Sequence, residues 1–287
     1  MGVSICLIFM LFFMYGCNSK DNINLKRIDF KQIQWYANRA SFAYNTPTEI
    51  QKTYPDTVRV ASVNGTDVQY FIENPVSASS QVISIRGTAN LANVREDAEY
   101  LPSKNHKLGI YVHKGFDEDT LLVYRDLLPH LDKNKKVILT GHSLGAAIST
   151  LLMMYLHEDG FTIELSINFG QPKVTNRKGA GKYAFLPLLR VADENDVVPL
   201  LPPTTLLDAI HGTYQHIGSE IILLEGLFYV FQDEHLQRQT SSDSFWKNLG
   251  HESIDEHFMK HYLHNINSKL DSSKEVPFEQ REKYIDK

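Results

Sequence analysis

The pentapeptide Gly141-His142-Ser143-Leu144-Gly145 restricts the fold of this chain more than any other feature of its sequence. It directly follows an apolar run at 137–140, which predicts a short strand. It directly precedes residues 144–157, whose Ala, Leu and Met content predicts a helix. Side chains two positions before and after the serine would collide in so tight a bend, and glycine removes them. We therefore predict a strand-to-helix bend that holds Ser143 in a strained conformation at a sheet edge; a turn without a catalytic role is the alternative.

The other elements predicted from hydrophobic periodicity alternate between strands and helices, which indicates parallel βαβ units in one α/β domain. Asn64-Gly65 lies between the first two predicted strands and is a strong signal for a hairpin turn. The domain is expected to cover 25–270, followed by a charged tail at 271–287 that packs loosely. We predict helices at 28–44, 117–131 and 254–266, and strands at 57–63, 68–73, 81–86, 164–169, 188–192 and 221–224.

Residues 1–16 differ in composition from the rest of the chain and predict a signal peptide. The stretch from Val3 to Tyr15 is almost unbroken apolar sequence, too short to span a bilayer but of the length of a signal-peptide core. Gly16-Cys17 follows it and resembles a bacterial lipobox, in which Cys17 would carry a lipid and become the mature N-terminus. We therefore expect an exported protein, anchored in a bacterial cell envelope. An ordinary signal peptide with an incidental cysteine is the alternative, because Met1-Gly2 supplies no positive charge.

Cysteine usage and charge exclude several classes of protein. Cys6 and Cys17 are the only cysteines, so the chain beyond the signal peptide can hold neither an internal disulfide nor a cysteine-based metal site. The net charge is −5 and no basic stripe is present, so no nucleic-acid partner is expected.

Ser143 needs a general base before its hydroxyl can act as a nucleophile, and the sequence offers candidates downstream. Asp196 follows the predicted strand at 188–192, at the end where a carboxylate can lie beside the bend; Asp193 is the alternative. Among the four late histidines, His257 stands at the start of the last predicted helix, where a side chain can project into a site. His257 and His261 have the spacing of a metal pair, but no glutamate separates them as in the zinc-protease pattern, so we expect no metal.

Six sequence blocks resemble those of the fungal-type (class 3) lipase family, in the family's order and over most of 28–266. The blocks are Gly141-His142-Ser143-Leu144-Gly145, Arg86-Gly87-Thr88, Val112-His113-Lys114-Gly115-Phe116, Phe169-Gly170-Gln171-Pro172-Lys173-Val174, Asp196-Val197-Val198-Pro199-Leu200-Leu201-Pro202 and Tyr214-Gln215-His216-Ile217-Gly218-Ser219-Glu220.

The resemblance implies an α/β-hydrolase fold, with a central, mostly parallel sheet flanked by helices and a short lid. It implies Ser143 as the nucleophile, Asp196 as the acid and His257 as the base, the last in an H-x-x-x-x-Y pattern that ends at Tyr262. Thr88 and the Leu144 N–H group would form the oxyanion hole. His216, His113 and Arg86 belong to the scaffold in this comparison.

The function that these residues imply is a serine carboxylic-ester hydrolase that acts on lipids like a triacylglycerol lipase, without a metal or organic cofactor. A phospholipase or a soluble-ester esterase would use the same site, and a non-catalytic envelope lipoprotein could keep the fold as a binding scaffold. Residues 89–101 take the position of the family's lid, but Arg95-Glu96-Asp97 makes this segment polar. We therefore do not expect strong activation at oil surfaces; a surface loop without a gating role is the alternative.

Overall fold

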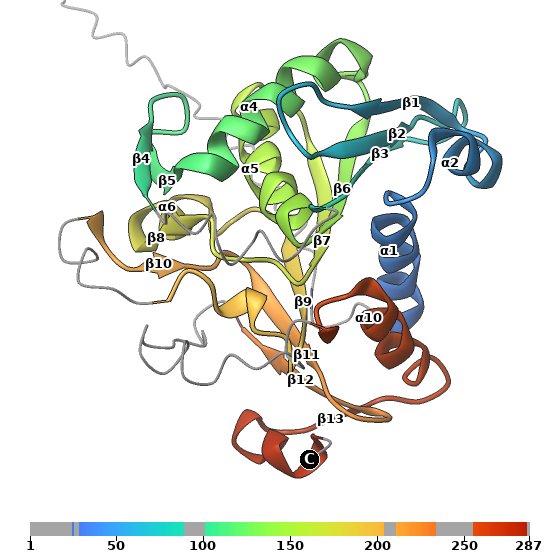
Figure 1. Cartoon of the computed structure of the whole chain (residues 1–287), viewed down its shortest axis with the longest axis vertical. Helices are drawn as coiled ribbons and strands as arrows, with labels where there is room; N and C mark the ends of the chain where they lie inside the picture. Colours follow the sequence, from blue (N-terminus) through green and yellow to red (C-terminus); the bar gives the residue numbers. More distant parts are fainter. Residues whose placement is uncertain (1–24, 26–28, 89–100, 204–210, 234–254, 286–287) are drawn as a thin grey trace, which may run out of the picture.

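The computed structural model describes residues 25, 29–88, 101–203, 211–233 and 255–285, and a nine-stranded sheet organises them (Figure 1). The strand order is β1-β2-β3-β6-β7-β9-β11-β12-β13. The five central strands β3, β6, β7, β9 and β11 are parallel, whereas β1–β2, β2–β3 and β11–β12 pair antiparallel. The bounds are β1 Thr57–Ser62, β2 Gln69–Glu73, β3 Ser80–Ile85, β6 Lys136–His142, β7 Ile163–Phe169, β9 Leu188–Asp193, β11 Ser219–Leu223, β12 Phe228–Gln232 and β13 Lys274–Glu275.

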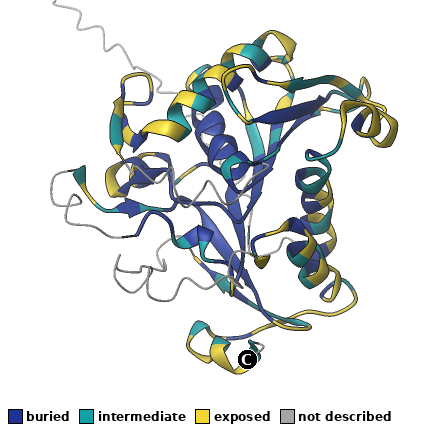
Figure 2. Cartoon of the chain, in the orientation of Figure 1, coloured by how far each residue is buried: buried dark blue, intermediate teal, exposed yellow. Residues whose placement is uncertain are grey.

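Helices cover both faces of this sheet, as the fold prediction requires. Helices α1 (Phe30–Phe42) and α10 (Met259–Asn267) pack together on one face, and α4 (Lys114–Leu127) and α5 (Leu144–Glu158) pack together on the other (Figure 1). Parallel strands bury both faces, so their sequences are apolar runs rather than alternating ones. Accordingly, β9 is buried along its whole length, and the central strands and α5 form the dark interior of Figure 2.

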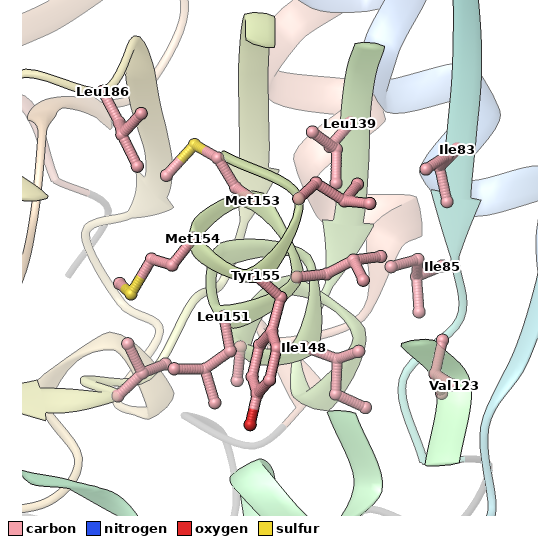
Figure 3. Close-up of a cluster of buried hydrophobic side chains, with 14 of the residues drawn as sticks. Ile83, Ile85, Val123, Leu139, Ile148, Leu151, Met153, Met154, Tyr155 and Leu186 are labelled. Atoms are coloured by element: carbon pink, nitrogen blue, oxygen red, sulfur yellow. The ribbon is translucent and has the colours of Figure 1, made fainter. Parts of the chain in front are cut away.

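Helix α5 lies at the centre of the larger hydrophobic core. Every residue from Gly145 to Leu156 is buried, because α5 is enclosed between the sheet and α4. Residues Ile148, Leu151, Met153 and Met154 of α5 belong to the same buried cluster as Ile85 and Leu139 of the sheet (Figure 3). The core therefore fixes the helix that begins directly after Ser143.

The remaining elements are short, and the sequence patterns did not predict them, apart from η2, which lies within the predicted helix at 117–131. A second, antiparallel sheet has the order β10-β8-β5-β4. These elements are β4 Pro102–Asn105, β5 Ile110–His113, β8 Thr175–Asn176, β10 Tyr214–Gln215, α2 Pro47–Thr53, α6 Arg177–Tyr183, and the 3-10 turns η2 Leu128–His130, η3 Val198–Leu200 and η4 Phe278–Tyr284.

The expectation of a loosely packed tail is wrong for the described part of 271–287. Strand β13 pairs in parallel with β12, and Val276 is 5 % exposed in a cluster with Ile222 and Val230. Arg281 also forms an ion pair with Glu194 at 2.8 Å. Most charged residues of the tail are exposed, whereas Val276 is buried and Phe278, Tyr284 and Ile285 pack against the same cluster. The charge pattern therefore gave no sign of this packing.

The predicted signal peptide, Cys17 and nearly all of the predicted lid (89–100) lie outside the described residues. Within the described ranges, no helix is both long and apolar enough to cross a membrane.

Candidate active site

Ser143 occupies a strained bend between β6 and α5. Its φ is 58° and its ψ is −127°, and no other described residue except glycine has a positive φ. A Cβ on Gly141 would lie 2.3 Å from the Gly145 carbonyl oxygen, and a Cβ on Gly145 would lie 2.4 Å from the Ile85 carbonyl oxygen. Both glycines are therefore required sterically, as the sequence pattern predicts.

Asp196 and His257 form a buried acid–base pair. The Asp196 Oδ2 atom lies 2.6 Å from His257 Nδ1, and the two side chains are 0 % exposed. The Tyr262 hydroxyl donates to the same Oδ2 at 2.5 Å, and the Val198 N–H donates to Oδ1 at 2.8 Å. Burial alone would raise the pKa of Asp196, but the His257 charge and these hydrogen bonds hold that pKa below its usual value. The carboxylate is therefore ionised and fixes the His257 ring.

The His257 ring and the Ser143 backbone each contact the carboxyl end of β7, at neighbouring residues. The Ser143 N–H donates to the Phe169 carbonyl at 3.0 Å. A Cβ on the next residue, Gly170, would lie only 2.7 Å from His257 Cε1, so the imidazole packs directly on this glycine. His257 Nε2 is buried, and the described residues offer it no hydrogen-bond partner. This nitrogen is therefore free to take a proton at the bend.

The Arg86-Gly87-Thr88 segment lies against the same bend. A Cβ on Gly87 would lie 2.6 Å from the His142 carbonyl oxygen and 2.9 Å from Ser143 Cβ. Leu144 is the first residue of α5, where backbone N–H groups have no partner within the helix. The predicted oxyanion donors thus come from the two segments that flank the serine.

The side chains of two other candidates, Asp193 and His261, have partners outside this pair. Asp193 accepts from the Asn265 side chain at 2.6 Å and from the Asn195 N–H, and burial raises its pKa to about 6. His261 pairs instead with Asp255 and Glu256 near the surface.

The other histidines of the sequence blocks have structural contacts. His113 caps α4 by accepting from the Phe116 N–H, and His216 Nε2 lies 2.7 Å from the Pro199 carbonyl. In the described part of the chain, no group of three or more His, Cys, Asp or Glu side chains is arranged to hold a metal ion.

Sequence reasoning missed two residues of the site. Tyr44 hydrogen-bonds His142 although it follows α1, and the sequence marks it only through its place in an apolar periodicity. Gly170 supports the base ring, and its only signal is its place in the F-G-x-P block. The base itself lies before α10 rather than on it, because Phe258 is extended and the helix begins at Met259.

A parallel sheet flanked by helices, with a serine on a strained strand-to-helix bend, defines an α/β-hydrolase fold. A lipase from Rhizopus microsporus var. chinensis has this fold with a TM-score of 0.64 and 23% identity, over 79% of this chain and 85% of that one. Residues 82–206 match the family described as Lipase (class 3).

Curated relatives resemble the chain over part of their length. The chain is 29% identical over 206 residues to the "Secreted mono- and diacylglycerol lipase 1" of Fusarium solani, with 61% of this chain and 60% of the relative covered. It is 31% identical over 167 residues to the "Lipase" of Rhizomucor miehei, with 54% and 44% covered. The chain therefore spans less than two thirds of the length of these relatives.

Proposed function

We propose that the protein is a serine carboxylic-ester hydrolase that acts on lipid esters in the manner of a triacylglycerol lipase. One observation carries the proposal: a buried Asp196–His257 pair, 2.6 Å apart, whose outer imidazole nitrogen has no partner among the described residues, in a protein whose Ser143 has a strained backbone. An acid that orients a base, together with a nucleophilic hydroxyl, is what acyl transfer requires.

The reaction proceeds in two halves on these groups. His257 Nε2 takes the Ser143 proton as Oγ attacks the ester carbonyl, and Asp196 stabilises the imidazolium that forms. The oxyanion is bound by the Thr88 and Leu144 N–H groups, and the imidazolium then protonates the alcohol that leaves. A water molecule, deprotonated by His257, attacks the acyl-serine, and collapse releases the carboxylic acid and restores Ser143.

The choice of acylglycerols as substrates is supported by the match of residues 82–206 to the Lipase (class 3) family and by relatives named as mono- and diacylglycerol or triacylglycerol lipases. A relative named as a phospholipase A1 is the reason to test phospholipid in parallel. The test is release of fatty acid from emulsified triacylglycerol, with mono- and diacylglycerol, phosphatidylcholine and a water-soluble short-chain ester as parallel substrates. We expect the acylglycerols to be hydrolysed fastest and Ser143→Ala to abolish release. Equal activity of Ser143→Ala would overturn the mechanism, and preference for phosphatidylcholine would overturn the substrate class.

We also propose that the protein is exported and that Cys17 carries a lipid anchor. The proposal is supported by the apolar segment that precedes Cys17 and, for export alone, by relatives named as secreted lipases. Mass spectrometry of the mature N-terminus is the test, with Cys17→Ser as the control. An N-terminus other than lipidated Cys17 would remove the anchor, and a retained Met1 would remove export as well.

A further inference from the structure

His142, the residue before the nucleophile, is buried between two other parts of the site. Its side chain is 2 % exposed, and its ring centroid lies 4.6 Å from that of His257. His142 Nδ1 lies 2.7 Å from the Tyr44 hydroxyl, and Nε2 lies 2.7 Å from the His257 backbone carbonyl oxygen. Each ring nitrogen therefore has one partner, and the mechanism proposed above uses neither.

The partners determine where the protons lie. A carbonyl oxygen only accepts, so His142 Nε2 carries the proton and donates to His257. Burial, together with the nearby His257, lowers the pKa of His142 to about 3, so the imidazole is neutral and has this single N–H group. Nδ1 is then a bare acceptor, and the Tyr44 hydroxyl must donate to it.

The Tyr44 oxygen in turn accepts from the Gly87 N–H at 3.2 Å. One directed chain of hydrogen bonds thus runs from Gly87 through Tyr44 and His142 to the backbone of His257. Its first residue precedes Thr88 of the oxyanion segment, and its last residue is the base. The strained Ser143 lies between them, adjacent to His142.

The backbone on both sides of Tyr44 is held as well. The buried Gln69 side-chain amide donates to the carbonyls of Ala43 and Asn45, each at 2.8 Å. The Gln69 backbone carbonyl accepts from the Arg86 N–H, also at 2.8 Å. Strand β2 therefore fixes Tyr44 and the start of the oxyanion segment relative to each other.

We propose that Tyr44 and His142 are positioning residues, which hold the oxyanion segment and the base His257 at a fixed spacing on either side of Ser143. This inference rests on the proposed function of the site. A displacement of about 1 Å in a reacting group can cost roughly 100-fold in rate, so the spacing of these two segments controls kcat. Loss of the Tyr44 hydroxyl leaves both the Gly87 N–H and His142 Nδ1 buried without their partner.

The first experiment compares Tyr44→Phe with Tyr36→Phe, a buried tyrosine of α1 that takes no part in these contacts. Tyr44→Phe is expected to lower kcat by about 10- to 100-fold and to change KM for a soluble ester by less than about threefold. Tyr36→Phe should keep the native kcat at the same assay temperature. Equal kcat values for native protein and Tyr44→Phe would overturn the proposal.

Two variants at His142 distinguish a positioning role of its hydrogen bonds from a role in packing alone. The amide nitrogen of Gln can replace Nε2–H as donor to His257, whereas the amide oxygen of Asn can replace Nδ1 as acceptor for Tyr44. We expect His142→Gln to retain at least about tenfold more kcat than His142→Asn when both are folded, because Gln preserves the contact to the base. Equal loss in both variants, or a loss that only follows their melting temperatures, would contradict the role.

A third measurement needs no variant. Nitrogen-15 NMR of the native protein should identify His142 as the neutral tautomer with its proton on Nε2; a proton on Nδ1 would overturn the directed chain. Failure of this inference differs from failure of the proposed function. If the native protein hydrolyses esters but the tautomer is wrong and Tyr44→Phe is fully active, only the inference fails. If the native protein hydrolyses no ester, the proposed function fails first.

Discussion

At the scale of single residues, the site depends on how closely backbone and side chains approach. Asp196 Oδ2 accepts from His257 and from Tyr262, so one oxygen carries two short hydrogen bonds. The Tyr262 hydroxyl also accepts from the Asp193 N–H at 3.2 Å, so α10 is bonded to the end of β9, just before Asp196. The imidazole then packs on a residue without a side chain, Gly170.

Gly170→Ala is predicted to lower kcat by about 100-fold or more while the protein remains folded. The new Cβ would meet His257 Cε1 at 2.7 Å and Asp196 Oδ2 at 3.1 Å, so the base must move. Gly226→Ala is the matched control, because Gly226 has a similar φ (60° against 56°) but no atom within 4 Å of the added Cβ. Equal effects of the two substitutions on kcat would show that backbone strain alone, not contact with His257, is responsible.

Tyr262→Phe is predicted to lower kcat by about tenfold and to raise the pKa of Asp196. The hydroxyl donates to the ionised carboxylate, and a hydrogen bond to a charged group contributes about 1.5–3 kcal/mol. Carbon-13 NMR of the Asp196 carboxyl should therefore show its titration at higher pH than in the native protein. An unchanged carboxyl titration and an unchanged kcat would mean that His257 alone keeps Asp196 ionised and oriented.

At the scale of elements, long apolar runs were predictable and short or polar elements were not. The runs that became β6, β7, β9 and α5 are buried on both sides, so their composition alone identified them. Strand β8 has two residues, and β4 has the sequence Pro-Ser-Lys-Asn, so neither shows a hydrophobic period. The start of α10 was predicted too early in the sequence, because the backbone of Phe258 is extended. Local sequence does not determine this conformation.

Within the candidate site, residues that carry a sequence signal could be predicted, whereas residues that depend on long-range contacts could not. Ser143 and Asp196 lie in sequence blocks, and His257 lies in the H-x-x-x-x-Y pattern, so their residue types indicate the chemistry. Tyr44 could not be found in this way, because its role depends on a contact with His142 across 98 positions of the chain. Contacts of this kind are set by the packing of α1 on the sheet.

The packed tail gives a prediction at this scale. Val276→Asp is expected to lower the free energy of unfolding by about 2–4 kcal/mol, because a carboxylate would replace the valine methyl groups that pack in a buried hydrophobic cluster. Val76→Asp is the control, because Val76 is 99 % exposed. Urea denaturation of both variants is the measurement. An unchanged midpoint for Val276→Asp would mean that the tail is loose in solution.

At the scale of the whole molecule, buried titratable groups make opposing contributions to stability below neutral pH. Burial lowers the pKa of His113 to about 4 and, with His257, that of His142 to about 3. These histidines stabilise the fold above pH 6.5, and this contribution is lost as the pH falls below that value. Burial raises the pKa values of Asp193 and Asp119 to about 6, and their contribution is instead lost as the pH rises through 6.

Asp193→Asn is therefore predicted to make acid destabilisation steeper. Burial raises the pKa of this carboxyl from the ordinary value of 3.8, so the folded state binds the proton more tightly and resists unfolding as the pH falls from 6 to 4. The free energy of unfolding of Asp193→Asn relative to native protein should be higher at pH 8 than at pH 5 by about 1 kcal/mol. Parallel stability curves across this range would show that Asp193 titrates as it does in the unfolded chain.

The proposed mechanism requires Ser143 to form a covalent acyl intermediate with the help of His257 and Asp196. Reaction of the native protein with a fluorophosphonate, followed by peptide mass mapping, tests this requirement. We expect one adduct per chain, on the peptide that contains Ser143, with ester hydrolysis lost in proportion to labelling. We also expect a much slower reaction for His257→Ala. An adduct on another residue, or full ester hydrolysis by a protein that carries the label on Ser143, would contradict the mechanism.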